Sequence, residues 1–259
     1  MRMKRVADLN DLFFNPHPDL EFGPCFLAYF DILGWSDLIR SKRGTDVADK
    51  IIGAIFQLKY ARQLLSEGQE MAAGGIVEFG GTLRASFFSD SMLYSCAAEA
   101  NEAAWLTDRV NLMCRWLLSE GLYTRGAMVV GDLHHESDGT VIGRALIEAH
   151  EIERDVAKYP RLIVTNAASS LLASAGDRAQ TLGPFVRTDA DGLAYLDIFS
   201  HMGREALLVA QNLVERDLRR TEDKDIFRNP AMALKHRAKY GWVRSRVEHA
   251  LAQAKSPAT

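Results

Sequence analysis

Apolar runs along the chain predict a set of short strands. Cys25 to Phe30 is a continuous apolar run of strand length, which is typical of a strand covered on both faces. Thr82 to Phe88 and Met92 to Cys96 are two more β-prone runs, and only a short polar stretch that contains Ser89 and Asp90 separates them. We therefore expect a β-hairpin with Asp90 at or next to its tip.

Apolar residues at helical spacing predict the connections between these strands. The predicted helices cover residues 35–42, 45–66 (capped by Thr45), 98–118, 143–157, 166–173 (capped by Asn166), 204–218 and 230–252. Further strands are predicted at 124–130, at 161–164, around Phe185 and at 193–198, with loops at the glycines of 74–81 and over 131–139. A hairpin stands where a doubly wound fold would have a crossover. The order is therefore α+β, and it fits a ferredoxin-like βαββαβ core with added strands and C-terminal helices.

Composition and charge narrow the class of protein. The chain has 259 residues, of which 47% are hydrophobic and 25% charged, and its formal net charge is −3. This charge gives no case for nucleic acid or a membrane as partner. No apolar run approaches the roughly 20 residues that span a bilayer, and the basic first five residues lead into Asp8 and Asp11 instead of an apolar signal core. We expect a cytoplasmic protein whose three cysteines are buried, reduced thiols.

Two aspartates stand where apolar runs end, and they are the first candidates for chemistry. Asp31 follows the run that begins at Cys25, and Asp90 follows Phe87-Phe88. Taken singly, an aspartate in this position is more often a helix cap or a turn former. Two of them brought together can hold divalent cations against a nucleoside triphosphate. Asp31 is also followed by a turn containing Gly34 into a predicted helix, and backbone amides at a helix start bind phosphate.

Strand alternation adds three side chains to this candidate site. Tyr29 shares the face of Asp31, while Ser86 and Arg84 share the face of Asp90. An aromatic ring, a hydroxyl and a guanidinium suit a base with its sugar or phosphate. Tyr29 would equally fill a core, and Arg84 would equally pair with a carboxylate at an interface. The pair His134-His135 lies in a polar stretch and is expected at the surface.

The ordered segments resemble the class III nucleotidyl cyclase catalytic domain over roughly residues 25 to 200. The matching segments are Tyr29-Phe30-Asp31-Ile32-Leu33-Gly34-Trp35, the Ser89-Asp90 hairpin, Arg125-Gly126-Ala127-Met128-Val129-Val130-Gly131, the alanine-containing helix from Gly143 to Ala149, and Pro160-Arg161-Leu162-Ile163-Val164. Within that superfamily the chain looks most like the compact bacterial pyrimidine cyclases of Pycsar anti-phage defence. Residues 1–23 lack clean periodicity and are expected to form an irregular leader. The resemblance places a catalytic domain at 24–200, and the predicted helices at 201–259 are expected to form an extension packed on the core or the dimer interface.

This resemblance implies a reaction and a set of site residues. The enzyme would convert UTP or CTP to the 3′,5′-cyclic monophosphate plus diphosphate, as a homodimer with active sites at the interface, and the product would act on a separate effector. Two Mn²⁺ or Mg²⁺ ions would be held by Asp31, Asp90 and the carbonyl of Ile32. The implied nucleotide-binding residues are Tyr29, Leu33, Gly34, Trp35, Arg84 and Ser86, and the implied catalytic residues are Asp31, Asp90 and Arg144.

Some positions depart from the family pattern. Ser86 and Thr140 stand where purine cyclases carry a lysine and an aspartate, which agrees with a different base. Ile147 and Glu151 stand where the family has its transition-state Asn and Arg. Arg144 is taken as the replacement, with Arg125 and Arg161 as other candidates. The alternative is a non-catalytic relative that binds nucleotide or protein, and a different palm-type enzyme is a third reading.

Overall fold

The fold is known from a computed structural model that describes residues 22–35, 69–72, 75–78, 82–88, 90–136, 139–176, 186–223 and 229–254. Nearly all of the predicted leader at 1–23 lies outside these residues. The same holds for the helix predicted at 45–66 and for all but the first residue of the helix predicted at 35–42.

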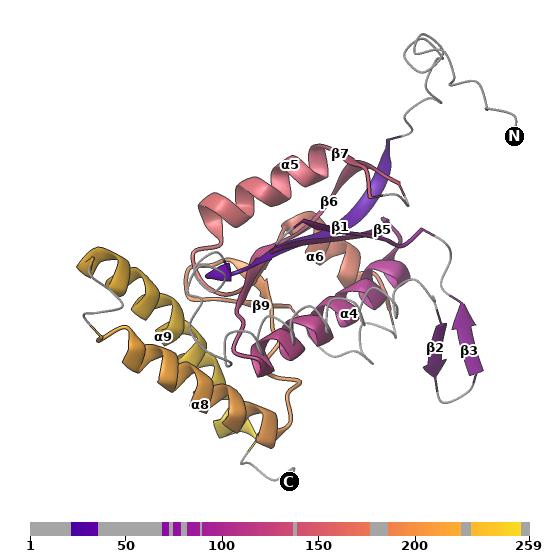
Figure 1. Cartoon of the computed structure of the whole chain (residues 1–259). Coiled ribbons are helices and arrows are strands. Elements are labelled where there is room, and N and C mark those ends of the chain that lie inside the picture. The colour runs from indigo at the N-terminus through magenta and orange to yellow at the C-terminus, as the bar shows by residue number, and fades with distance from the viewer. Residues whose placement is uncertain are drawn as a thin grey trace, which may run out of the picture.

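One mixed sheet organises the described chain (Figure 1). Its strands are β1 (Gly23–Ile32), β4 (Arg84–Phe88), β5 (Ser91–Ala97), β6 (Thr124–His135), β7 (Val141–Gly143), β8 (Leu162–Val164), β9 (Val186–Thr188) and β10 (Ala194–Leu196). They follow the order β4-β5-β1-β6-β8-β10-β9, and β7 pairs with the end of β6. The β6–β8 pair is parallel and the other pairs are antiparallel.

The half of the sheet around β1 has the ferredoxin-like arrangement. β1 is central between β5 and β6, β4 is the edge beyond β5, and α4 (Ala100–Ser119) connects β5 to β6. This order confirms the predicted α+β class. It arises because β1 is apolar on both faces, and such a strand is buried only in the middle of a covered sheet.

Alternate residues of β1 serve two different cores. Phe26, Ala28 and Phe30 join the larger core, which lies under α4, α6 (Asn166–Ala173), α8 (Arg204–Arg220) and α9 (Pro230–Gln253). Leu27 faces the opposite side, where α5 (Arg144–Glu151) packs with Ala145 and Ala149 on the sheet. Figure 1 shows α5 alone on its face, with the other labelled helices on the opposite side. The row of Leu27 on β1 continues to Asp31.

Two predicted loops are partly strand. The stretch 131–139 was expected to be a loop, but β6 runs on to His135 because Gly131, Asp132 and Leu133 pair with the start of β1, and Leu133 to His135 also pair with β7. Within the glycine-containing region 74–81 lies β3 (Gly75–Glu78), which pairs antiparallel with β2 (Gln69–Ala72) in a separate two-stranded sheet. Glycine spacing alone did not reveal these long-range pairings.

Helix boundaries follow the apolar periodicity closely, with local corrections. The helix predicted at 143–157 is α5 followed by a π-helical turn, Ile152–Val156. The cap of α6 is Thr165, whose hydroxyl accepts from the amide of Ala168, and not Asn166 as predicted. Gly143 precedes α5 with φ +154°, and a Cβ there would lie 2.4 Å from the carbonyl oxygen of Asp132. Only glycine permits this tight junction between β7 and α5.

The three cysteine thiols are free in the structure. Cys96 and Cys114 are buried and Cys25 is half-buried. Burial raises the pKa of each thiol above its ordinary value, to about 12 for Cys114. A raised pKa keeps a thiol protonated and unreactive, so these residues act as packing groups.

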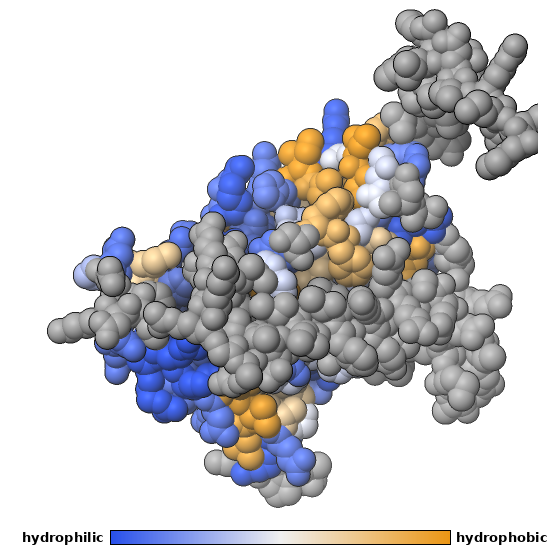
Figure 2. Space-filling model, viewed as in Figure 1, coloured by the Kyte–Doolittle hydropathy of each residue, from blue (hydrophilic) through white to orange (hydrophobic). Residues whose placement is uncertain are grey.

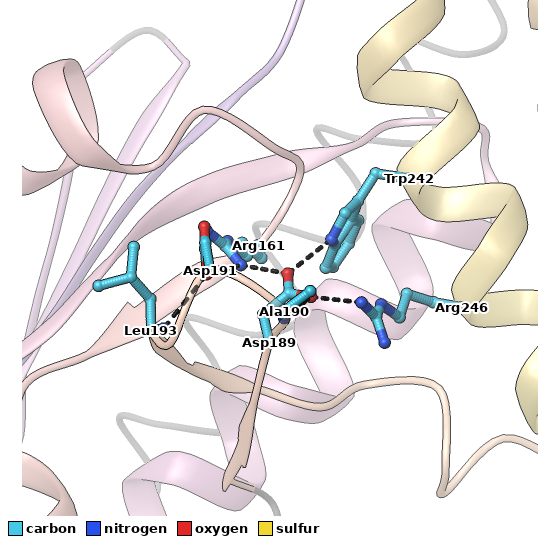
Figure 3. Close-up of polar contacts among 7 residues, drawn as sticks. All are labelled: Arg161, Asp189, Ala190, Asp191, Leu193, Trp242 and Arg246. Atoms are coloured by element: carbon cyan, nitrogen blue, oxygen red, sulfur yellow. Dashed lines mark hydrogen bonds and ion pairs between the residues drawn. The ribbon is translucent and has the colours of Figure 1, made fainter.

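A buried ionic network fixes α9 against the sheet (Figure 3). Asp189, in the β9–β10 turn, accepts from the Trp242 indole at 2.7 Å and pairs with the guanidinium groups of Arg161 and Arg246. Arg161 also pairs with Asp191, which is half exposed. Trp242 and Arg246 lie on α9, so the Asp189 carboxylate joins that helix to the β9–β10 end of the sheet. None of the described helices, α9 included, is long and apolar enough to cross a membrane.

We expect Asp189→Asn to lower the free energy of unfolding by about 3–5 kcal/mol, because it leaves the buried Arg161 without its buried counter-charge. Asp191→Asn is the matched control and should cost less than about 1 kcal/mol, since its carboxylate is partly in water. Urea denaturation of the two variants measures both values. Equal losses would show that the Asp189 pair does not hold the structure together.

Candidate active site at the end of the central strands

Asp31 and Asp90 lie on neighbouring strands at the same end of the sheet. Asp31 is the penultimate residue of β1, and Asp90 is in the turn that leads into β5. The amide of Ile32 donates to the carbonyl of Asp90 at 3.0 Å, so the two segments touch through their backbones. Burial raises the pKa of Asp31, and the charge of Asp90 adds to that rise. The Asp31 carboxylate therefore lies within electrostatic range of Asp90.

Arg125 stands between two acidic groups at this end of the sheet. It is directly opposite Asp31 in the β1–β6 register, and its NH2 lies 3.3 Å from Asp31 Oδ2. The same nitrogen pairs with Oε1 of Glu153, which lies in the π-helical turn after α5. The second oxygen of Asp31, Oδ1, is buried and has no hydrogen-bond partner among the described residues. One lone-pair direction of this carboxylate is thus left for another group.

Glu153 is the second titrating group of the cluster. Its pKa rises to about 7, first because it is buried and next because of the negative charge of Asp31, while Arg125 acts in the opposite direction. Below about pH 7 Glu153 is therefore mostly protonated, which reduces its repulsion with Asp31.

Tyr29 lies beside this cluster, on the face where α5 packs. Its hydroxyl donates to Ser91 Oγ at 3.3 Å and is 3.5 Å from His150 Nδ1. The His150 ring meets the tyrosine ring edge-on, and its Nδ1 is 3.8 Å from Glu153 Oε2. The phenol is half-buried, so part of it is open to a ligand at the strand end. A role for Tyr29 in binding a base stays a prediction.

Ser86 occupies a different part of the same face. It is buried, and its hydroxyl lies 2.9 Å from His135 Nε2 and 3.1 Å from the Gly139 carbonyl oxygen. His135 also reaches Ser95 Oγ at 2.7 Å. Burial, followed by the charge of Arg84, lowers the pKa of His135 to about 4, so the ring is neutral. His135 was expected at the surface, but the extension of β6 turns it inward against the two serines.

The structure does not bring Arg84 and Arg144 to Asp31 within one chain. Arg84 pairs with Ser95, four residues from Ser91, which corresponds to about 13 Å along the strand. Arg144 begins α5 and is exposed, and Glu153 follows nine residues later, or roughly 13 Å along a helix. Both arginines lie toward the other end of the α5 face.

The turn after β1 offers fewer free amides than its sequence implied. The Leu33 amide donates to the Tyr123 carbonyl at 2.8 Å, and the Ile32 amide is bonded to Asp90. Gly34 has φ +77°, which favours glycine, and a helical residue follows at Trp35. Gly34 and Trp35 are therefore the phosphate-binding candidates of this turn, while Leu33 has a structural bond.

The residues present are compatible with a divalent cation that is completed by substrate. No group of three or more His, Cys, Asp or Glu side chains suited to a metal occurs in the described parts of the chain. Asp31 does have the buried, unpartnered Oδ1, and Asp90 stands next to it. Mg²⁺ is commonly held by one or two carboxylates together with substrate phosphates. Such a site needs the nucleotide to complete the ligand set.

The comparisons with known proteins found similar solved structures but no matching sequence family. No protein-family model matches the sequence, and no curated protein does. The adenylyl cyclase CyaB from P. aeruginosa is 14% identical with a TM-score of 0.46, over 68% of this chain and 94% of that one. The guanylyl cyclase Cya2 is 12% identical with a TM-score of 0.43, over 68% and 92%. A bacterial light-regulated adenylyl cyclase is 16% identical with a TM-score of 0.40, over 77% and 59%.

Sequence reasoning did not identify Glu153 or His150. Both stand in a predicted helix among other charged residues, where acidic side chains usually face water. The turn after α5 is π-helical, and this irregularity directs Glu153 onto the sheet. Arg125 carried a usable signal, because it immediately precedes the glycine of the Arg-Gly strand and that glycine packs tightly. A Cβ on Gly126 would lie 2.0 Å from the Tyr29 carbonyl oxygen.

The raised pKa of Glu153 predicts a pH dependence of stability. Between about pH 4.5 and 7 the unfolded chain loses this proton while the folded protein keeps it, so the free energy of unfolding falls as pH rises through that window. Glu153→Gln should remove this part of the pH dependence. The free energy of unfolding of the variant minus that of the wild type should therefore be larger at pH 8 than at pH 5. Urea denaturation at both pH values measures this. An unchanged difference between the two proteins would contradict the prediction.

Proposed function

We propose that this protein is a pyrimidine nucleotidyl cyclase that converts UTP or CTP to the 3′,5′-cyclic monophosphate and diphosphate. The observation that supports this most directly is the meeting of Asp31 and Asp90 at one strand end, with Asp31 Oδ1 buried and unpartnered. The ordered sequence motifs around these two residues support the same assignment. By the resemblance, the product would be a second messenger in anti-phage defence, read by a separate effector.

Different groups of the site would bind the metal ions and the phosphates. Asp31, Asp90 and the Ile32 carbonyl would hold Mn²⁺ or Mg²⁺, which neutralises phosphate charge and makes the ribose 3′-hydroxyl more acidic when bound. The amides of Gly34 and Trp35 would bind phosphate oxygens at the start of a helix. Because the attack is intramolecular, holding the 3′-oxygen in line with the α-phosphorus supplies much of the rate enhancement.

A homodimer would explain the residues at the far end of the α5 face. Arg144 and Arg84 lie too far from Asp31 to act on the same site within one chain. A two-fold contact between copies pairs one end of a face with the other end of its partner, so Arg144 of one copy can complete the Asp31 site of the next. Exposed apolar side chains support a contact here: Ile142 and Ile147 are 48% and 61% exposed, and Figure 2 shows apolar side chains gathered over β7 and α5.

A non-catalytic nucleotide-binding or protein-binding relative is the second candidate. Ile147 and Glu151 provide neither the amide nor the guanidinium that the family uses at those positions. Arg125 also occupies one oxygen of Asp31, and a metal ion would compete with this ion pair. This candidate predicts stabilisation by nucleotide without turnover.

The cyclase proposal predicts product from a pyrimidine triphosphate. Purified full-length protein incubated with each of the four NTPs and Mn²⁺ should form cyclic product from UTP or CTP, detected by mass spectrometry. Asp31→Asn and Asp90→Asn should each lower the rate by at least about 100-fold, because each removes a cation ligand. Asp155→Asn, an exposed carboxylate paired with Arg154, is the control and should keep full activity. Absence of product with all four NTPs would rule the enzyme out, and binding without product would favour the second candidate.

The dimer proposal predicts complementation between two inactive variants. Asp31→Asn and Arg144→Ala should each be inactive alone. When they are mixed and allowed to exchange subunits, each mixed dimer contains one site with both residues intact, so about a quarter of wild-type activity should return. Mixing Asp31→Asn with Asp90→Asn is the control, and it should restore nothing, since both aspartates belong to the same strand end. If the first mixture also stays inactive, Arg144 does not act across the interface.

A further inference from the structure

The C-terminal helix α9 carries a lysine, Lys239, on the side that packs on the rest of the protein. Lys239 is one helical turn before Trp242 and Val243, both of which are buried against the larger core. Residues at this spacing share one face of a helix. Lys239 is accordingly half-buried, whereas Arg237, on the other side of the same helix, is exposed. The lysine thus belongs to the packed stripe of α9 and not to its solvent face.

Tyr123 fixes this part of α9 to the loop that carries the site. Its ring packs on that of Tyr240, the residue after Lys239, with 5.2 Å between centroids. Its carbonyl accepts the Leu33 amide, and its hydroxyl donates to Asp217 of α8 at 2.9 Å. One tyrosine therefore connects α8, α9 and the turn that follows Asp31. Figure 1 shows α9 packed along α8, away from α5.

The charges around Lys239 are those of the candidate site. Burial lowers the pKa of Lys239, and the charges of Arg125 and Lys235 act in the same direction. The charges of Asp31 and Glu153 act in the opposite direction. Among the ion pairs found between described residues, none includes Lys239. Asp31 and Glu153 already have Arg125 as their cation. Lys239 therefore adds a positive charge that none of these ion pairs neutralises, and an anionic ligand would neutralise it.

We propose that Lys239, supplied by α9 of the same chain as Asp31, binds the phosphate chain of the substrate. The assignment rests on the proposed function for the identity of the substrate as a nucleoside triphosphate, and on the packing of α9 for the placement of the charge. A lysine ammonium donates charge-assisted hydrogen bonds to phosphate oxygens. In this arrangement the C-terminal extension is part of the active site, and it supplies positive charge that α5 lacks at Ile147 and Glu151.

Binding measurements test this proposal apart from turnover. Inorganic tripolyphosphate, UTP and uridine are titrated by calorimetry into the full-length wild type, Lys239→Met, Lys239→Arg and Arg237→Ala. Lys239→Met should weaken tripolyphosphate and UTP by about tenfold or more and leave uridine unchanged, because a charged hydrogen bond to phosphate is lost. Lys239→Arg should keep most of the affinity. Arg237→Ala removes one positive charge from the exposed side of the same helix and should bind like the wild type.

The outcomes separate this proposal from the cyclase proposal. If the wild type binds UTP but makes no cyclic product, the proposed cyclase reaction is wrong. The role of Lys239 is then still decided by whether Lys239→Met loses tripolyphosphate binding. If Lys239→Met binds both phosphate ligands as tightly as the wild type, or if the wild type binds neither, the Lys239 assignment is wrong. Equal losses in Lys239→Met and Arg237→Ala would also overturn it, since they would show a general charge effect.

Discussion

The register of three strands determines what this protein can do. β1 lies between β5 and β6, and its pairing sets Asp31 opposite Ser91 on one side and Arg125 on the other. Because side chains alternate along a strand, a shift of one residue would turn Asp31 into the larger apolar core and Ile32 toward α5. An unpaired carboxylate in that core would be far more costly than any gain from the shift. The apolar residues of β1 therefore fix the position of the acidic site as well as the core.

Several groups lower the free-energy cost of burying acidic side chains at this end of the sheet. Two neighbouring carboxyl groups do not both ionise readily, and here the pKa of Glu153 rises to about 7, first through burial, while Arg125 pairs with Asp31. The arrangement leaves Asp31 Oδ1 without a hydrogen bond, which is a local cost. This open oxygen, beside Asp90, supports the proposal that the cluster binds a ligand.

Local sequence was sufficient for the fold class and for most of the elements. The apolar run of β1, the hairpin around Asp90 and the periodicity of α4 each depend on neighbouring residues, and each was predictable. The end of β6 and the inward position of His135 depend on pairing with residues over 100 positions away, at the start of β1, so glycine and histidine in that stretch were taken for a loop. The site follows the same division. Asp31, Asp90 and Tyr29 were predicted from strand ends and alternation. Glu153 joins Arg125 only through a π-helical turn, and the proposed role of Lys239 depends on the packing of α9.

The packing of α9 has a consequence for how the site is held together. Asp189 joins Arg161, next to β8, to Trp242 and Arg246 on α9, and Tyr123 joins the same helix to the turn after Asp31. Neither Arg161 nor Asp189 bonds to Asp31 or Asp90. Both nevertheless help to fix the position of α9 against the sheet. A cation carried on a helix is only as well positioned as the contacts that hold that helix. Buried ion pairs often add little net stability, but the Arg161–Asp189 pair orients α9, on which the proposed role of Lys239 depends.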